Sequence, residues 1–283
     1  MGEAFYRSNN GDFTLLQGDC VAVTDGLGEG VFDMIFADPP YFLSNGGISC
    51  RRGKVVCVDK GEWDKGGTLE TVDAFNLRWL SACRKALKDA GTIWISGTYH
   101  NIFSVANALP RLGYRILNVI VWQKTNPPPN IMCRFFTHSA EYVIWARKHE
   151  KKPHYFDYGL MKRINANKQM TDVWTLPAVS RWEQSCGKHP TQKPLSLLAR
   201  IILASTMRGA LVLDPFAGSC TTGIAANLLG RRFVGIDLSE EYLALGRARR
   251  EEIEDRSKRD EYLTKMERQA PLGAGLALYG AAH

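Results

Sequence analysis

Short runs of β-branched and aromatic residues alternate along the chain with longer stretches whose apolar residues recur every three or four positions. The short runs predict strands, and the longer periodic stretches predict helices. The predicted strands are Phe13–Gln17, Phe32–Ala37, Thr92–Ser96, Arg115–Gln123, Tyr142–Arg147, Leu211–Asp214 and Arg232–Asp237. The predicted helices are Leu69–Lys88, Asn101–Leu112, Pro194–Met207, Thr221–Leu229 and Glu240 to about Arg256.

This alternation is typical of an α/β fold in which helices cover both faces of a mostly parallel sheet. We therefore expect a doubly wound, mostly parallel sheet of seven strands. The strands Arg115–Gln123 and Tyr142–Arg147 are joined by a Pro-rich loop without a convincing helix. Because a parallel pair needs a long crossover connection, we expect this pair to be antiparallel.

Three segments fall outside the alternation. Phe42–Gly67 is a long loop rich in Gly, Lys and Arg, and Lys148–Lys193 mixes basic with aromatic residues, as an inserted recognition segment would. Arg268–His283 is rich in Gly and Ala, and we expect it to be frayed or disordered. The chain is thus divided into one half of a domain (1–147), an insert (148–193), the other half of that domain (194–256) and a partly disordered tail (257–283).

The composition favours a polyanionic partner. Lysine and arginine total 36 against 29 aspartates and glutamates, a formal net charge of +7. No uncharged apolar run approaches the ~18 residues that span a bilayer, so we expect a cytoplasmic protein that binds no membrane. The seven cysteines are scattered without a CxxC pair, which predicts reduced thiols and neither a disulfide framework nor a metal site.

The tetrapeptide Asp38-Pro39-Pro40-Tyr41 directly follows a predicted strand. Ligands of open α/β sheets bind at the carboxyl ends of strands, so the tetrapeptide lies where chemistry is expected. Its carboxylate and carbonyls are hydrogen-bond acceptors and its aromatic ring is a stacking surface, which together suit a planar ring that bears an amine. Taken alone, it is equally consistent with an ordinary turn at a strand end.

A second candidate site lies in Leu211–Gly223, where a strand ends in Asp214 and a loop of small residues leads into a helix. Backbone N–H groups at such a helix N-terminus bind polar ligands. The next strand ends in Asp237, about 20 residues after the loop, the usual position of a carboxylate that binds ribose hydroxyls. The arrangement suits an adenosine-type cofactor, and an ordinary βαβ unit is the alternative.

Two other segments are less informative alone. His189–Pro194 is polar and precedes a predicted helix, so without further context it is best explained as a helix cap. Gly26–Gly30 is rich in glycine but precedes a strand and opens no helix, so it is interpreted as a connecting turn.

Taken together, these segments resemble the β-type amino methyltransferases, a family that uses S-adenosylmethionine to methylate exocyclic amines of DNA. In that family DPPY is catalytic, a D-x-F-x-G-[ST]-G-T-T segment binds the cofactor, and a histidine or serine before T-x-K-P marks the cofactor's methionine end. The order of motifs matches the β-type arrangement over Phe13–Arg256. Phe42–Ser49, Trp122–Pro127 and Cys133–Ser139 look most like the Dpn-type group, the second adenine methyltransferases of GATC restriction systems.

The resemblance implies adenine as the target base, because the cytosine-amine branch usually carries Ser where Asp38 stands. The Asp38 carboxylate and the Pro39 carbonyl would accept hydrogen bonds from the amine. Pro40 would stiffen the turn, and Tyr41 would stack on a base flipped out of the duplex.

The same resemblance implies the residues that bind the cofactor. Asp19 would lie near the adenine ring of S-adenosylmethionine, Asp237 at its ribose, and Lys193 and His189 at its carboxylate. Its sulfonium would face the Asp214–Thr222 loop, through Asp214, Phe216, Gly218, Ser219, Thr221 and Thr222.

For DNA, basic side chains are expected to neutralise phosphates, with a merely solvated basic surface as the alternative for each. These side chains are Arg51, Arg52, Lys54, Lys162, Arg163 and Lys168. Lys124 is a further candidate DNA contact, and Asn126, Asn130 and Arg134 are candidates to reach base edges, which the sequence does not choose among.

Cys220 departs from the family pattern, because it stands where the cofactor loop normally has its second glycine. A positive φ there would be strained, and its side chain would need room beside the cofactor. The alternatives are a cytosine-N4 methyltransferase, an RNA or protein methyltransferase, which the motif order and the insert disfavour, and a non-catalytic DNA-binding relic. The expected function is methylation of adenine N6 in GATC, on double- and single-stranded DNA, with a homodimer and a cognate restriction endonuclease as candidate partners.

Overall fold

The computed structural model describes residues 4–41, 48–51, 54–57, 68–127, 129–130 and 133–269. Within the predicted loop Phe42–Gly67 it describes the backbone of an antiparallel hairpin of β4 (Ile48–Arg51) and β5 (Lys54–Cys57). The rest of that loop lies outside the described residues, as do residues 270–283 of the predicted tail.

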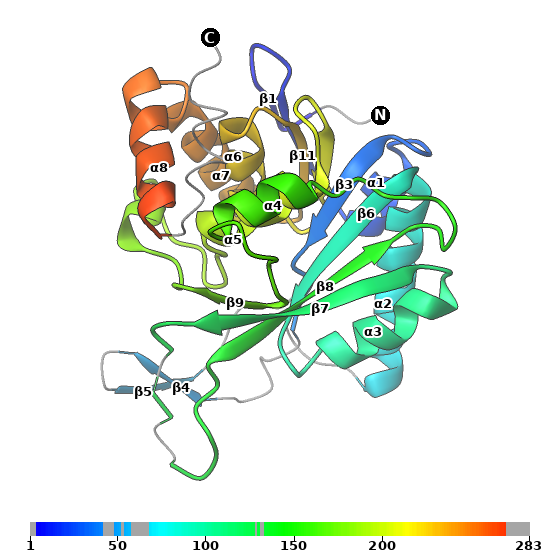
Figure 1. Ribbon diagram of the computed structural model, residues 1–283, viewed down its shortest axis with the longest axis horizontal. Coiled ribbons are helices and arrows are strands. Elements are labelled where there is room, and N and C mark those ends of the chain that lie inside the picture. The colour runs from blue at the N-terminus through cyan, green and yellow to red at the C-terminus, as the bar shows by residue number, and fades with distance from the viewer. Residues whose placement is uncertain are drawn as a thin grey trace.

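A nine-stranded sheet runs through the molecule in the order β1-β2-β11-β10-β3-β6-β8-β7-β9 (Figure 1). Its strands are β1 (Tyr6–Arg7), β2 (Phe13–Gln17), β3 (Phe32–Ala37), β6 (Leu87–Gly97), β7 (Arg115–Lys124), β8 (Ala140–Arg147), β9 (Val173–Leu176), β10 (Leu211–Asp214) and β11 (Arg232–Asp237). All seven predicted strands are present. The predicted number was wrong, because β1 and β9 extend the sheet at its two edges.

The five strands β2, β11, β10, β3 and β6 are parallel, so their carboxyl ends meet at one edge of the sheet. β8 lies between β6 and β7 and is antiparallel to both, which confirms the prediction made from the helix-free loop. A hydrophobic core lies on each face of the sheet. Because side chains alternate between the faces of a strand, Trp94 of β6 packs into one of these cores, while Ile93 and Ile95 pack into the other.

Helices cover both faces of the sheet. α1 (Cys20–Asp25), α2 (Leu69–Ala86) and α3 (Ile102–Arg111) lie on one face. α4 (Tyr158–Ile164), α5 (Leu195–Ser205), α6 (Thr221–Leu228), α7 (Glu240–Glu252) and α8 (Arg256–Gln269) lie on the other (Figure 1). In the part of the chain that is described, no helix is both long and apolar enough to cross a membrane.

Residues 257–269 of the predicted tail 257–283 lie in α8, a helix that the sequence pattern did not predict. Its Tyr262 and Met266, one helical turn apart, are buried, and the Tyr262 ring meets Trp182 edge to face at a centroid distance of 5.3 Å. The Gln269 amide donates to Ser180 Oγ. α8 therefore packs against the end of the insert, through contacts with Trp182 and Ser180.

The predicted insert 148–193 is joined to the main sheet. β9 pairs in parallel with β7, and Trp174 on β9 is buried beside Trp94. The Arg200 guanidinium of α5 lies 5.1 Å from the centre of the Trp174 ring. Part of this aromatic-rich segment is therefore core.

Candidate active site

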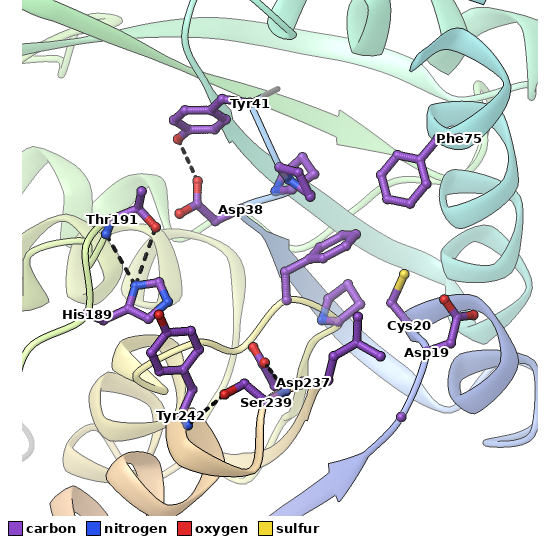
Figure 2. Close-up of a pocket in the computed structure, with 16 residues that line it drawn as sticks. Asp19, Cys20, Asp38, Tyr41, Phe75, His189, Thr191, Asp237, Ser239 and Tyr242 are labelled. Carbon is purple, nitrogen blue, oxygen red and sulfur yellow. Dashed lines mark hydrogen bonds between the residues drawn. The ribbon is translucent and has the colours of Figure 1, made fainter. Parts of the chain in front are cut away.

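The carboxyl ends of β2, β3, β10 and β11 surround a cavity of about 330 Å³, which we call the first cavity (Figure 2). This position follows from the parallel topology, because loops leave each strand at the same edge of the sheet. Its described lining is Gly18, Asp19, Cys20, Asp38, Pro39, Pro40, Tyr41, Phe75, His189, Thr191, Pro215, Phe216, Asp237, Leu238, Ser239 and Tyr242.

The Asp38–Tyr41 turn is fixed by hydrogen bonds from neighbouring elements. The Tyr41 hydroxyl donates to Asp38 Oδ1 at 2.6 Å and lies 3.3 Å from Ser96 Oγ on β6. The Asn101 amide, just before α3, donates to the Pro40 carbonyl at 3.0 Å. Burial and the charge of Asp38 raise the pKa of Tyr41 well above its ordinary value, so its hydroxyl keeps its proton.

Lys193 forms a buried ion pair with Asp38. Its Nζ lies 2.6 Å from Asp38 Oδ2, donates to the Thr191 carbonyl at 3.2 Å and is 3.8 Å from Glu141 Oε2. Burial lowers the pKa of Lys193, but the charges of Asp38 and Glu141 raise it more, so the net direction is upward. The ammonium therefore remains charged beside the Asp38 carboxylate.

A second cavity, of about 380 Å³, lies next to the first, and Tyr41, His189 and Thr191 line both. The rest of its described lining is Thr98, Trp122, Lys124, Glu141, Ala178, Val179, Gln184, Pro190, Gln192 and Lys193. The Lys124 ammonium is 2.5 Å from Glu141 Oε1 and 5.2 Å from the centre of the Trp122 ring. The second cavity thus combines aromatic rings with charged groups.

The carboxylate of Asp237 faces the first cavity at the end of β11. Its Oδ2 accepts the Gly218 N–H at 2.8 Å and its Oδ1 accepts the Ser239 N–H at 2.9 Å. Burial raises the pKa of Asp237, although these hydrogen bonds lower it. Gly218 has φ 48°, and a Cβ built there would lie 3.0 Å from His189 Nε2, so the loop needs glycine at this position.

Four predicted cofactor residues hold the loop together and are not among the described residues that line the first cavity: Asp214, Ser219, Thr221 and Thr222. The Thr222 hydroxyl donates to Asp214 Oδ2 at 2.6 Å. The buried Arg249 guanidinium of α7 donates to the Ser219 carbonyl at 2.5 Å and to Thr221 Oγ1 at 2.9 Å. Burial raises the pKa of Asp214 to about 7.

Cys220 has the left-handed backbone conformation, with φ 57° and ψ 30°, that the sequence analysis expected to be strained for a residue other than glycine. Its side chain is fully buried and lies against Gly246 of α7, where a Cβ would come within 2.2 Å of the Cys220 sulfur. The side chain is therefore accommodated under α7 and does not line the first cavity.

The structure brings Asp19, His189, Phe216 and Asp237 together with the Asp38–Tyr41 turn, as predicted, but places Lys193 in the second cavity. Asp19 is also the N-cap of α1, where it accepts the N–H groups of Val21 and Ala22. Sequence reasoning missed Gly18, Cys20, Phe75, Thr191, Pro215, Leu238, Ser239, Tyr242 and Glu141. Leu238 and Ser239 directly follow Asp237, a signal that could have been used, whereas the sequence places no motif around Phe75.

The predicted DNA contacts lie in two places. Lys124 lines the second cavity, and Asn126 beyond it accepts the Ala178 N–H at 3.1 Å. Asn130 and Arg134 follow in the β7–β8 loop, and Arg134 is exposed. Lys162, Arg163 and Lys168 belong to α4 or follow it. The Asp157 N–H, just before α4, donates to the Ala204 carbonyl in the last turn of α5. The other end of α5 follows Lys193 of the second cavity, and α5 is about 16 Å long, so α4 begins at the end of α5 remote from the cavities. Arg52 and the side chains of Arg51 and Lys54 lie outside the described part.

Comparisons with known proteins show what this chain is similar to. A DNA methylase family model matches residues 32–248. The chain is 52% identical to the type II methyltransferase M2.MboI of Moraxella bovis, over 88% of this chain and 91% of that one. It is 53% identical to the type II methyltransferase M2.DpnII of Streptococcus pneumoniae, over 89% and 93%.

Two solved structures share the fold. The M1.HpyAVI–SAM complex is 27% identical, with a TM-score of 0.64 over 84% of this chain and 98% of that one. The cytosine-N4-specific PvuII DNA methyltransferase is 19% identical, with a TM-score of 0.70 over 94% and 96%, and it shows the fold alone.

Proposed function

This chain belongs to the DNA methylase family, and from that premise we propose that it transfers a methyl group from S-adenosylmethionine to the N6 amine of adenine in DNA. The observation that carries the proposal is the position of Tyr41, which directly follows Asp38-Pro39-Pro40 and lines both cavities. One cavity can hold the methyl donor and the other the base, because Asp38 lines the first cavity and is ion-paired with Lys193, which lines the second.

The first cavity fits S-adenosylmethionine by its chemistry. Asp237 is a carboxylate suited to ribose hydroxyls, Phe75 and Phe216 are aromatic faces suited to an adenine ring, and His189 is a polar group for the methionine end. When bound, S-adenosylmethionine supplies an electrophilic methyl group and leaves as a neutral thioether.

Asp38 and the Pro39 carbonyl are assigned to the amine. The lone pair of the N6 amine is delocalised into the adenine ring, and acceptors for its N–H groups draw the nitrogen towards tetrahedral geometry. The nitrogen lone pair then forms the N–C bond while the electrons of the C–S bond go to sulfur. The amine proton released afterwards goes to Asp38 or to water, and no covalent bond to the protein forms.

The second cavity is assigned to the flipped base. The target amine is out of reach inside a stacked duplex, so the base must leave the stack. Tyr41, which the sequence predicts to stack on the base, lines this cavity, and Lys124 leads from it to the β7–β8 loop with its predicted DNA contacts. DNA passing over this edge would meet Asn126, Asn130 and Arg134.

Adenine is favoured over cytosine by Asp38, and GATC by the resemblance of three segments to the Dpn-type group. The relatives M2.MboI and M2.DpnII are named type II methyltransferases, which supports a role beside a restriction endonuclease of the same specificity. The cytosine-N4-specific PvuII enzyme shares only the fold, so it does not favour cytosine.

The test is transfer of labelled methyl groups to duplex oligonucleotides with and without GATC, followed by digestion and mass spectrometry of the nucleosides. We expect N6-methyladenine confined to GATC. Detection of N4-methylcytosine instead would mean that the target base is cytosine and not adenine. Asp38→Asn keeps the shape of the side chain but removes its charge, and it should abolish transfer, whereas turnover above a few per cent of wild type would contradict the role of Asp38.

A further inference from the structure

We infer that Lys193 is a positioning residue that orients the Asp38 carboxylate, and that Glu141 holds Lys193 in place for this purpose. The inference rests on the proposed function and adds two residues to it. Lys193 comes from the segment before α5, Glu141 from β8 and Asp38 from the end of β3, so the three groups meet only in the folded protein.

The Lys193 side chain is buried and its ammonium is held by several contacts. Its side chain is 6% exposed, and its Nζ contacts Asp38 Oδ2 at 2.6 Å and the Thr191 carbonyl at 3.2 Å. The same ammonium lies 5.2 Å from the centre of the Tyr41 ring. A buried ammonium is costly unless carboxylates and hydrogen-bond acceptors surround it, and here both are present.

Both oxygens of Asp38 are engaged by fixed donors. Tyr41 donates to Oδ1 and Lys193 to Oδ2, each at 2.6 Å. The terminal torsion of an aspartate is otherwise loosely restricted, so two donors on opposite oxygens fix the plane of the carboxylate. Each oxygen has a second lone pair, which leaves an acceptor for an amine N–H.

Glu141 continues a row of alternating charges away from Asp38. Its Oε2 is 3.8 Å from Lys193 Nζ, and its Oε1 is 2.5 Å from Lys124 Nζ. The row Asp38, Lys193, Glu141 and Lys124 carries two negative and two positive charges, so it is neutral as a unit. Because Lys124 ends β7, the row connects Asp38 to the strand that leads into the β7–β8 loop.

The resemblance to the amino methyltransferases instead predicts Lys193 at the carboxylate of the cofactor. The two roles affect different quantities. A residue that binds the cofactor lowers cofactor affinity when removed, whereas one that positions Asp38 lowers the rate of transfer in the fully bound complex.

The experiment compares Lys193→Met, Lys193→Ala and Glu141→Gln with Lys188→Met, an exposed lysine of the same segment, as control. The dissociation constant of S-adenosylmethionine is measured by calorimetry, and the single-turnover rate at saturating cofactor and DNA. We expect a rate about 100-fold lower for Lys193→Met and about 10-fold lower for Glu141→Gln, as for other residues that orient a reacting group, with cofactor affinity within about threefold. Lys188→Met should match wild type.

Chemical rescue separates positioning from a general structural role. Lys193→Ala leaves space beside Asp38 Oδ2, so propylammonium added to this variant should restore part of the rate, with no effect on wild type. Wild-type rate in Lys193→Met would overturn the inference. Weakened cofactor binding with a normal rate at saturation would also overturn it, as would a folded Lys193→Ala that no amine restores. Absence of methylation by the wild-type enzyme would instead count against the proposed function.

Discussion

Asp237 is the residue whose removal tests the ribose contact. Each of its oxygens already accepts one backbone N–H, from Gly218 and from Ser239, which aims the remaining lone pairs into the first cavity. Asp237→Ala should weaken binding of S-adenosylmethionine by about 1–3 kcal/mol, the cost of leaving buried polar partners unpaired. Calorimetry on the isolated protein measures this, and unchanged affinity would refute the contact.

Asp214 gives the molecule a predictable dependence of stability on pH. Burial raises its pKa from an ordinary 3.8 to about 7. Between pH 4 and pH 7 the unfolded chain therefore releases this proton before the folded chain does, so rising pH favours unfolding and this contribution to stability is lost. Above pH 7 both states are ionised and the effect is constant.

Asp214→Asn cannot titrate, and its amide can replace the carboxylate opposite Thr222 and the Phe216 N–H. The free energy of unfolding of this variant, minus that of wild type, should therefore rise from pH 5 to pH 8 by about 1–3 kcal/mol. Urea titrations at both pH values measure the difference. A difference that stays constant with pH would mean that Asp214 does not titrate in this range.

At the scale of elements, the cofactor loop packs against α7 where the Cys220 side chain lies against Gly246. Gly246→Ala would place a Cβ within 2.2 Å of the Cys220 sulfur, so we expect a loss of about 1–3 kcal/mol in the free energy of unfolding. Cys220→Gly removes that sulfur and permits the positive φ. In the double variant the cost of Gly246→Ala should largely disappear, whereas strictly additive costs would contradict the contact.

The sequence predicted those elements whose pattern reflects burial on one or two faces. The seven strands were recovered because each is a short run rich in β-branched and aromatic residues, and the antiparallel pair because no helix lies between its strands. α8 was missed because it is polar along most of its length and buries only Tyr262 and Met266. β9 was missed because it has only four residues, of which alternate ones are buried, and it lies in a segment interpreted as an insert.

In the site, too, local sequence patterns locate some residues and leave others to be found only in the fold. Asp38–Tyr41, Phe216 and Asp237 follow strands directly, so a local pattern locates them. The ion pair of Lys193 with Asp38 joins residues 155 positions apart, and only the fold reveals it. The predicted loop residues Asp214 and Thr222 were found by pattern, but the pattern could not show that their side chains bond to each other.

At the scale of the whole molecule, we expect methylation of adenine in single-stranded as well as duplex DNA. An unpaired adenine avoids the few kcal/mol needed to flip a base out of its pair. In the insert, Trp174 is buried and Trp182 packs on Tyr262, whereas Phe156 and Tyr158 are exposed and could stack on an unpaired base. Initial rates on one GATC oligonucleotide, alone and annealed to its complement, measure the preference, and activity confined to the duplex would contradict it.

The strand order also governs how the protein is made. β10 and β11 lie between β2 and β3, although the chain reaches them only after residue 210. During synthesis on the ribosome, β2 and β3 therefore emerge long before the two strands that separate them. Their facing edges stay open until residue 237 leaves the exit tunnel, and open edges pair readily with other chains. A nascent chain stalled before this point exposes both edges at once and is therefore the species most in need of a chaperone.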